Sequence, residues 1–557
     1  LFTVGDTSVF TLANGNGDNT VTNTGQFKAT GTTVFTLATA DGTNRVLNGP
    51  SAEFNVSGLT TFNFADAVGG SVVENEGTFK STGLTTFVGL DDFNNSGLLS
   101  MQNTYADHGW GPSPYYGSRV GDVTMMTGHF NAGAGSRLAI DAILAGRYNS
   151  ASDLLVVGGD VTGAPTEVQV NFDASVAGQY NPFGTPVVGV VSGNTGLGDF
   201  HLANGPIDRG LFRYDLFLDE PGAPAPAGSK SWVLASYADG SAYALAEFAG
   251  LAQGIWNTTS DSWIDRAGDL RVSSQQGPDD PAKKSGIWGR FIGNGAERST
   301  EKTITPFQNQ SVTIDTGYDQ TLWGFQVGID HEFEGNVADG VLIAGVLGGY
   351  VSSNADFNSG DSVRFSGPQV GVYASWVKGG LYVDGLVKGD FLKADYNVAG
   401  SDSDTDSTTI GVRVETGYRY FTSTGMFIEP NASLAYAHSS IDDVTIAGTP
   451  ARFDDGDGLE GKLGARFGGT SLKDGIKYDP YLSVGIAGNL LSDNSVFFSS
   501  GPGLVLEDDA PDVFGEVGAG INIFSTKSGW TGFAKADLRF GDDYIGGTGK
   551  IGANWAW

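Results

Sequence analysis

The sequence has no cysteine in its 557 residues. This absence excludes disulfide frameworks, cysteine-ligated zinc, iron–sulfur clusters and thiol catalysis. Two kinds of protein share it: a cytosolic protein that avoids cysteine by chance, and a chain that crosses an oxidising periplasm unfolded, where a premature disulfide would block passage. No cofactor is predicted.

Long apolar runs and positive charge are also scarce. No run of about 18 apolar residues occurs, which excludes a transmembrane helix. Lys and Arg number 31 against 63 Asp and Glu, so the formal net charge is −32. Nucleic acid and anionic membrane surfaces are therefore not expected as partners, because both require a basic surface. The chain begins Leu1-Phe2-Thr3 in the middle of a pattern, which favours a processed or truncated start.

The first 100 or so residues repeat with a period near 25. Phenylalanines at 10, 35, 62 and 87 are 25, 27 and 25 residues apart. A second register agrees, because Gly25-Gln26-Phe27 matches Ala52-Glu53-Phe54 and Gly77-Thr78-Phe79. Short alternating strands with Asn, Gly and Asp corners at this period predict a parallel β-helix, whereas a leucine-rich repeat would need a denser leucine ladder. We predict this β-helix over residues 1–121.

An aromatic insert, rich in Pro and Gly, interrupts the β-helix at 101–121. It is interpreted as a loop that covers the coil stack, with a ligand-contacting loop as the alternative. Residues 122–237 hold further strands without a clean period.

Residues 238–284 change in character. Leu245, Phe248, Ala252, Ile255 and Trp256 follow i, i+3, i+4 spacing, and this spacing continues along much of the segment to Leu270. The pattern predicts one long helix over 241–271, followed by a polar linker at 275–284.

Residues 285–557 alternate between two faces. In 381–391 the odd positions are apolar or small, and the even positions include Asp384, Lys388 and Asp390. A water-soluble sandwich also alternates. Polar tracts between short turns, and aromatics near segment ends such as Trp288 and Trp376, instead favour an outer-membrane barrel with aromatic girdles. We count twelve segments, beginning near residues 286, 318, 340, 364, 380, 408, 425, 459, 478, 512, 529 and 547. An even count suits a closed antiparallel transmembrane β-barrel, because lipid offers no partner for an open strand edge.

The chain as a whole resembles the autotransporters of Gram-negative bacteria (type V secretion), most strongly across 255–293. The segment from Ile255-Trp256 to Arg271, a polar linker, and Gly286-Ile287-Trp288-Gly289-Arg290 together resemble the family's pore helix running into its first strand. By this resemblance the pore-helix residues are Ile255, Trp256, Trp263, Arg266, Asp269, Leu270 and Arg271, and the first-strand residues are Trp288, Gly289 and Arg290. The arginines and Asp269 would face a polar lumen.

Two further segments resemble the same family. The terminal heptapeptide is similar to the signal that the barrel-assembly machinery reads, through Ile551, Ala553, Trp555 and Trp557, although the family more often ends in Phe. Residues 122–237 resemble the pertactin-like autochaperone end of a β-helix.

The resemblance implies an all-β fold: a parallel β-helix passenger, a pore helix and a 12-stranded antiparallel transmembrane barrel. It also implies an outer-membrane location with the passenger at the cell surface. The implied partners are outer-membrane lipid, the barrel-assembly machinery and a host or cell-surface ligand, with the chain acting as a monomer.

Signatures of catalysis and metal binding are weak. No Gly-x-Ser-x-Gly and no His-Glu-x-x-His occurs, and the five histidines lie at 108, 129, 201, 331 and 438. The acidic tract at 402–406 lacks the glycine and the glutamate of a calcium loop, since Ser407 and Arg413 occupy those positions. It is interpreted as a solvated loop, as is 454–458. No catalytic and no metal-binding residue is predicted.

Two classes of function follow. The first is a secretion device whose β-helical passenger is an adhesin or surface interaction module, and the chain is then not an enzyme. The alternative is an enzyme-bearing autotransporter, a protease or esterase, whose catalytic part lies upstream of residue 1. An ordinary porin is a weaker third option.

Overall fold

The computed structural model describes residues 1–39, 41–65, 68–103, 120–172, 174–220, 229–274, 285–422, 425–508, 513–525 and 529–557. Within residues 262–274 it describes the backbone only. The described chain forms two compact units. One contains Leu1–Ala238, Ile304–Val312 and Ser500–Pro502, and the other contains Asp239–Thr303, Thr313–Ser499 and Gly503–Trp557. Within the described residues, no helix is both long and apolar enough to cross a membrane.

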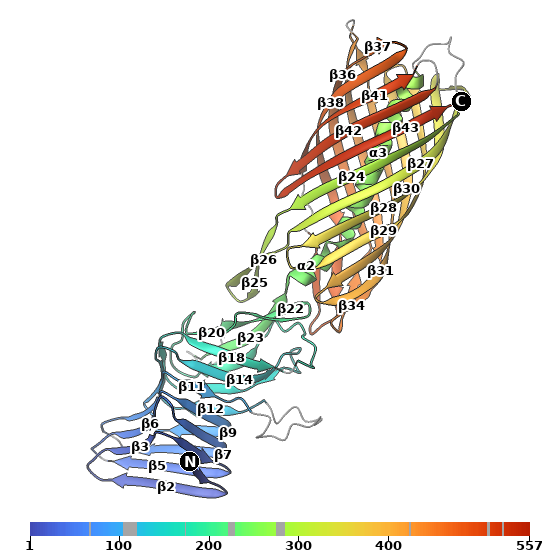
Figure 1. Ribbon diagram of the computed structural model, residues 1–557. Helices are drawn as coiled ribbons and strands as arrows, with labels where there is room; N and C mark the ends of the chain where they lie inside the picture. The colour runs from blue at the N-terminus through green and yellow to red at the C-terminus, as the bar shows by residue number, and fades with distance from the viewer. Residues whose placement is uncertain are drawn as a thin grey trace. The chain divides into compact units, whose positions relative to one another are not determined.

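The first unit begins as a stack of parallel coils (Figure 1). One wall is formed by strands β2 (Thr7–Asn14), β5 (Thr32–Thr39), β7 (Glu53–Ala65), β9 (Thr78–Val88), β12 (Val123–Met126) and β16 (Leu154–Val157). Another wall contains β1 (Phe2–Val4), β4 (Gln26–Ala29), the first halves of β7 and β9, β11 (Leu98–Ser100), β14 (Arg137–Ile143) and β18 (Thr166–Phe172). The third wall is formed by β3 (Asn19–Asn23), β6 (Asn44–Asn48), β8 (Ser71–Asn75), β10 (Asp92–Asn95), β13 (His129–Ala132) and β17 (Val161–Gly163). The predicted parallel β-helix is confirmed.

The repeated phenylalanines form two ladders inside the coils. Phe10, Phe35, Phe62 and Phe87 pair in register from strand to strand. Their ring centroids are 4.9, 4.5 and 4.7 Å apart, which is the rise of one coil on the next. The second register forms the other ladder, in which Phe27, Phe54 and Phe79 stack at 4.5 and 5.1 Å. The period of the sequence is therefore the length of one coil.

A ladder of asparagines on the third wall was not predicted. The side-chain amide of Asn23 donates to Asn48, Asn48 donates to Asn75, and Asn75 donates to Asn95, over 2.9, 2.8 and 2.7 Å. Each amide also donates to a backbone carbonyl of the following coil, as Asn48 does to Thr78. The ladder satisfies buried polar groups that would otherwise destabilise the coil interior.

The described part of residues 122–237 ends in antiparallel pairing. Strand β19 (Thr185–Val190) pairs with β23 (Lys230–Ala238), which pairs with β22 (Phe212–Asp219). The short strands β15 (Ala151–Ser152), β20 (Phe200–Leu202) and β21 (Ile207–Arg209) complete this end. The predicted insert lies outside the described residues from 104 to 119.

The second unit starts with two helices in place of the single predicted one. Helix α2 (Gly240–Ala246) begins at Asp239, whose carboxylate accepts a hydrogen bond from the Ala242 amide at 3.0 Å. Helix α3 (Phe248–Ser274) follows after Glu247. The predicted linker lies outside the described residues.

The rest of the second unit is a closed barrel of twelve antiparallel strands. They are β24 (Ser285–Arg298), β27 (Tyr318–Val337), β28 (Gly340–Phe357), β29 (Ser362–Lys378), β30 (Leu381–Val398), β31 (Ser401–Tyr418), β33 (Met426–Ile441), β36 (Gly456–Gly469), β38 (Ile476–Asp493), β41 (Val513–Ser525), β42 (Trp530–Gly541) and β43 (Tyr544–Ala556). Pairing of β24 with β43 and of β31 with β33 closes the ring. The predicted twelve-stranded barrel is confirmed.

Shorter strands lie in the connections. Hairpin β25 (Glu301–Phe307) to β26 (Gln310–Asp315) follows β24, and β32 (Tyr420–Phe421) and β37 (Ser471–Lys473) extend single turns. Two connections build a four-stranded sheet from β34 (Val444–Ile446), β35 (Thr449–Phe453), β39 (Ser495–Phe498) and β40 (Leu504–Glu507). Several of the fully described turns are tight, as at Gly379-Gly380, where Gly379 has φ +59°.

The strands alternate as predicted, with apolar side chains outward and polar ones toward the lumen. In β30, Val383, Val387 and Phe391 are exposed, whereas Asp384, Lys388 and Asp390 are buried. Two expectations are corrected. Trp288 is buried and faces inward, because its side chain lies on the lumen side of β24. The acidic tract at 402–406 belongs to strand β31 and pairs with β30, so it is not a loop.

Candidate functional site

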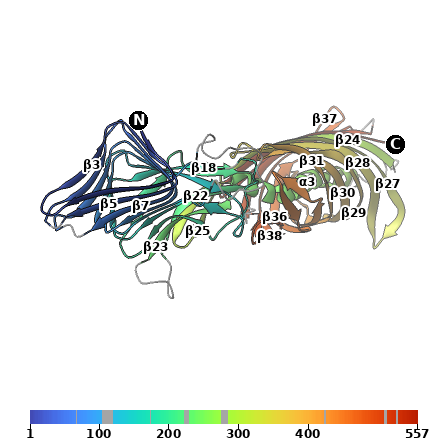
Figure 2. The same cartoon turned by 90° about the horizontal axis from the view of Figure 1, so that it is seen from below.

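Helix α3 lies within the ring of barrel strands (Figure 2). Leu251, Ala252, Ile255, Trp256 and Thr259 are each at most 2% exposed. The helix packs against β28, β29, β30, β31, β33 and β36. The candidate site is therefore the lumen together with the helix that occupies it.

Trp256 anchors α3 to one side of the lumen. Its indole nitrogen donates to the Lys388 carbonyl oxygen at 2.9 Å, and the Lys388 ammonium lies 5.3 Å from the centre of the ring. Ala435 and Ala437 pack against the indole. Gly411 leaves the space that the indole fills, because a Cβ at 411 would lie 2.5 Å from it. Small residues on β31 and β33 thus form a slot for one large side chain.

Thr259 is the polar centre of the same contact. Its hydroxyl donates to the Ile255 carbonyl at 2.7 Å and accepts from the Gln369 amide at 3.0 Å. The Lys388 ammonium also donates to this hydroxyl. Lys388 pairs with Asp390 at 2.9 Å, and both side chains are fully buried. A buried ion pair is stable only when its remaining hydrogen bonds are made, and Thr259 supplies one of them.

Two carboxylates hold the helical segment to arginines of the wall. Glu247, between the two helices, pairs with Arg298 at 2.9 Å, where the two side chains are 8% and 4% exposed. Asp261 pairs with Arg413, which is 1% exposed. Arg413 also donates to the Asn257 side-chain oxygen at 3.3 Å. These charge-assisted bonds are stronger than neutral ones because both partners are ionised, and their enclosure in the lumen strengthens them further.

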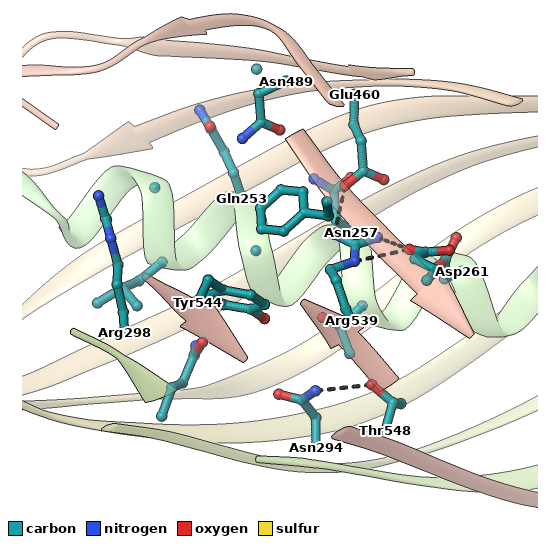
Figure 3. A pocket seen from close by; sticks show the side chains of 18 of the residues that line it. Gln253, Asn257, Asp261, Asn294, Arg298, Glu460, Asn489, Arg539, Tyr544 and Thr548 are labelled. Carbon is teal, nitrogen blue, oxygen red and sulfur yellow. Dashed lines mark hydrogen bonds and ion pairs between the residues drawn. The ribbon is translucent and has the colours of Figure 1, made fainter. Parts of the chain in front are cut away.

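A polar cavity of about 160 Å³ remains on the other side of α3 (Figure 3). Gln253, Asn257 and Asp261 face it from the helix, one turn apart. Strands β24, β36, β38, β41, β42 and β43 supply the opposite lining, which includes Arg298, Glu460, Arg539 and Tyr544. The lumen is therefore filled unevenly, with dense contacts at β28–β33 and open polar space at β36–β43.

The pore-helix residues named from the sequence are only partly described. Ile255 and Trp256 are fully buried in α3. The backbone at Trp263, Arg266, Asp269, Leu270 and Arg271 is helical, but these five side chains lie outside the described residues. Their orientation toward the lumen remains a prediction.

The first-strand residues all lie in β24. The Trp288 indole donates to the Tyr373 hydroxyl at 2.7 Å. The Arg290 guanidinium lies 4.7 Å from the Trp288 ring and donates to Gln326 at 2.9 Å. Gly289 pairs with Val327 on one side and Ala553 on the other. Trp288 and Arg290 thus connect the first strand to the polar lumen.

The C-terminal residues close the barrel. In β43, Ile551 pairs with Phe291 and Trp555 with Ile287 of β24. The alternate residues Ile551, Ala553, Trp555 and Trp557 are all exposed on the outer surface. Trp555 stacks on Trp530 at 6.4 Å and lies 5.3 Å from Trp557. The four residues therefore share one outward face of the barrel.

The histidines do not gather at one place. His129 and His201 belong to the first unit, whereas His331 and His438 are in barrel strands. His108 lies outside the described residues. Within the described part of the chain, no cluster of three His, Asp or Glu side chains is placed to hold a metal ion.

Sequence reasoning missed Glu247, Thr259 and Asp261. A signal for the polar side of α3 was present, because Gln253, Asn257 and Asp261 recur every fourth residue. No signal in the sequence identifies their partners, since Arg413 and Lys388 lie more than a hundred positions away.

Comparison with known proteins shows which family the barrel region matches. Residues 302–537 match the family model described as autotransporter beta-domain. A pertactin autotransporter of Bordetella parapertussis is 28% identical over 277 residues, which are 48% of this chain and 27% of the relative. The adhesin BmaC autotransporter of Brucella suis biovar 1 is 31% identical over 171 residues, 29% of this chain and 5% of the relative. The chain thus matches about a quarter or less of the length of these curated relatives.

Solved structures also resemble about half of the chain. The beta domain of the Bordetella autotransporter Brka is 22% identical, with a TM-score of 0.38, and the match covers 49% of this chain and 100% of that one. The transport unit of the autotransporter AIDA-I from Escherichia coli is 16% identical, with a TM-score of 0.40, over 52% and 97% of the two chains.

Proposed function

We propose that this chain, whose residues 302–537 are an autotransporter β-domain, exports its own N-terminal β-helix and then anchors it through α3. A β-domain of this kind lies in the outer membrane of a Gram-negative bacterium, with the passenger exported to the cell surface. Its outward apolar side chains face lipid. The observation that carries the proposal is a buried helix in the lumen, which directly precedes the first barrel strand in the sequence.

Stacking of coils would supply the driving force for export. Each coil adds a Phe to each of two ladders and a link to the asparagine chain, so a new coil forms on an existing template. Folding outside the membrane would then oppose backward sliding without any nucleotide. We assign residues 122–237 the role of that template, an autochaperone. This role is supported by their buried core and by their antiparallel closing strands.

The passenger is proposed to be an adhesin or surface interaction module and not an enzyme. The name of the Brucella relative supports an adhesive role, and both curated relatives are named as pertactin or adhesin autotransporters. The test compares cells that display the full chain with cells that display a chain lacking residues 1–121. Binding to a host-cell surface should require the β-helix, and equal binding by both would contradict the adhesive role.

The barrel-assembly machinery is proposed as the partner that reads the C-terminal strand. The outward face formed by Ile551, Ala553, Trp555 and Trp557 supports this assignment, because it is apolar and lies on the strand that closes the barrel against β24.

Deletion of residues 241–271 tests whether α3 lies in the lumen as an anchor for the passenger. The reconstituted barrel should conduct more ions without the helix, because α3 now fills one side of the lumen. A matched control exchanges Gly254 for Ala, at a position where an added Cβ meets nothing within 4 Å. This variant should conduct as the unaltered chain does. An unchanged conductance after the deletion would favour an ordinary porin with the helix outside the pore.

A further inference from the structure

Six charged side chains form a closed circuit in the lumen. Arg413 pairs with Asp261 and, at 3.4 Å, with Glu460. Arg539 pairs with Glu460 at 2.8 Å and with Glu516 at 2.6 Å. Lys462 pairs with Glu516 and, at 3.8 Å, with Asp261, which completes the circuit. Acids and bases alternate around the ring, and Figure 3 shows Asp261, Glu460 and Arg539 around the polar cavity.

Only one member of the circuit belongs to the helix. Asp261 comes from α3, whereas the other five come from strands β31, β36, β41 and β42. We call these five residues the wall cluster: Arg413, Glu460, Lys462, Glu516 and Arg539. The wall cluster holds three cations and two carboxylates, so without the helix it carries one uncompensated positive charge.

The wall cluster is also largely enclosed. Its side chains are between 1% and 24% exposed. Four of the six pairings join wall residues only, so the arrangement does not depend on α3 for its geometry. The neighbouring Lys535 is balanced by Asp537 at 3.1 Å, and Lys550 lines the same cavity. A buried cation without a partner is strongly destabilising, so the empty wall favours the arrival of a carboxylate.

The helix offers few acids that could fill this position. Residues 248–260 contain no charged side chain. The preceding acid, Glu247, is 14 positions away, about 21 Å along a helix, and is already paired with Arg298. Asp265 is the next acid after Asp261, one turn on. If the wall cluster accepts only one carboxylate, then the possible positions of the helix along the barrel differ by about one helical turn.

We propose that the wall cluster is a carboxylate-binding seat, and that its capture of Asp261 sets the register at which the chain comes to rest in the barrel. This inference depends on the proposed function, because only a chain that moves through the barrel needs a stopping point. Trp256 and Thr259 fasten the helix to the opposite wall, and the seat selects which turn of the helix lies at the level of those contacts.

Cysteine cross-linking tests the seat in the intact chain, because the sequence has no native cysteine. Gln253 contacts Gly458, where an added Cβ would lie 2.7 Å from the Gln253 side-chain oxygen. A short bifunctional thiol cross-linker should therefore join the pair Q253C/G458C in the resting register. Adding D261N should abolish this cross-link and produce one in N257C/G458C, because Asp265 then occupies the seat and the helix shifts by one turn. Persistence of the Q253C/G458C cross-link in D261N would overturn the proposal.

Further variants distinguish a specific loss of carboxylate binding from a general loss of stability. D261E keeps the carboxylate and should keep the Q253C/G458C cross-link, so equal loss in D261E and D261N would also overturn the proposal. D261N/D265N should lose the shifted cross-link. D319N removes an exposed carboxylate of β27 that is outside the circuit, and it should leave the resting cross-link intact. If Q253C/G458C fails to cross-link in the otherwise unaltered chain, then α3 does not rest in the lumen as proposed. That result would contradict the proposed function and not only the carboxylate-binding seat.

Discussion

Three glycines, one above another, decide where each coil of the β-helix turns. Gly31, Gly58 and Gly83 have φ of +82°, +89° and +90°, in the left-handed region that side chains rarely adopt. Each also approaches the previous coil closely. A Cβ at Gly58 would lie 2.5 Å from the Gly31 carbonyl oxygen, and one at Gly83 would lie 2.3 Å from that of Gly58. The corner requires glycine for both reasons.

Replacing Gly58 with Ala should destabilise the β-helix by about 1–3 kcal/mol, from the strained φ and the backbone contact. The measurement is the melting temperature of the passenger in the full chain, followed by circular dichroism in detergent. Gly25→Ala is the control, because nothing lies within 4 Å of its added Cβ. An equal drop in both variants would show that the corner is not special.

Asp153 makes the stability of the first unit depend on pH. Burial, with the nearby carboxylates of Asp122 and Asp141, raises the pKa of Asp153 to about 8. The backbone amides of Asp141 and Asp122 donate to this carboxyl and oppose the shift in pKa only in part. The unfolded chain loses this proton near its ordinary pKa of 3.8, whereas the folded chain keeps it. The free energy of unfolding should therefore be highest in acid and fall as the pH rises from about 4 to 8.

The variant D122N removes one of the two neighbouring negative charges, so it should make this fall with pH less steep. The side-chain amide oxygen that the substitution introduces can still accept the hydrogen bond from the Gly83 amide, which Asp122 accepts at 2.8 Å. Urea unfolding of the two chains at several pH values gives the comparison. A variant with the same slope as the unaltered chain would exclude Asp122 as a cause.

At the scale of elements, a strand or coil can be predicted when its sequence pattern repeats with a clear period. Barrel strands were predictable because lipid and lumen impose opposite chemistry on alternate residues, and the predicted starts at 318 and 340 coincide with β27 and β28. The coils were predictable from Phe10, Phe35, Phe62 and Phe87. The break between α2 and α3 was not, because the apolar spacing continues across Glu247.

The features that could not be predicted from the sequence depend on contacts between residues far apart in the chain. Thr259 and Asp261 look like ordinary polar residues of a helix, and their roles depend on Lys388 and Arg413. Likewise Trp288 is of the residue type expected in an aromatic girdle but faces inward. A shift of one position along a strand moves a side chain to the opposite face of the sheet.

The last strand provides a prediction of its own. Trp557→Asp should reduce the fraction of chain that reaches the membrane as a folded barrel, because a charge replaces an apolar side chain on the outward face. Heat-modifiable migration on gels measures that fraction. Ala556→Ser, at the adjacent inward-facing position, should assemble normally. Normal assembly of both variants would contradict the proposed signal.

At the scale of the whole molecule, the two units should respond differently to protease. Digestion of intact cells should remove the chain before about residue 240 and leave the barrel strands intact, since lipid and closed pairing protect them. Mass spectrometry of the membrane fraction identifies the boundary. Complete protection of residues 1–237 in intact cells would place the passenger on the wrong side of the membrane.

The distribution of contacts along α3 also has a mechanical consequence. Gln253, Trp256, Thr259 and Asp261 bind the wall at successive levels of the lumen. Tension applied to a passenger bound at a distant surface would run along the helix axis and shear all of these bonds at once. Bonds loaded in parallel share the force, whereas bonds that peel apart break one after another. The barrel should therefore hold its passenger against a steady pull far better than any single contact could.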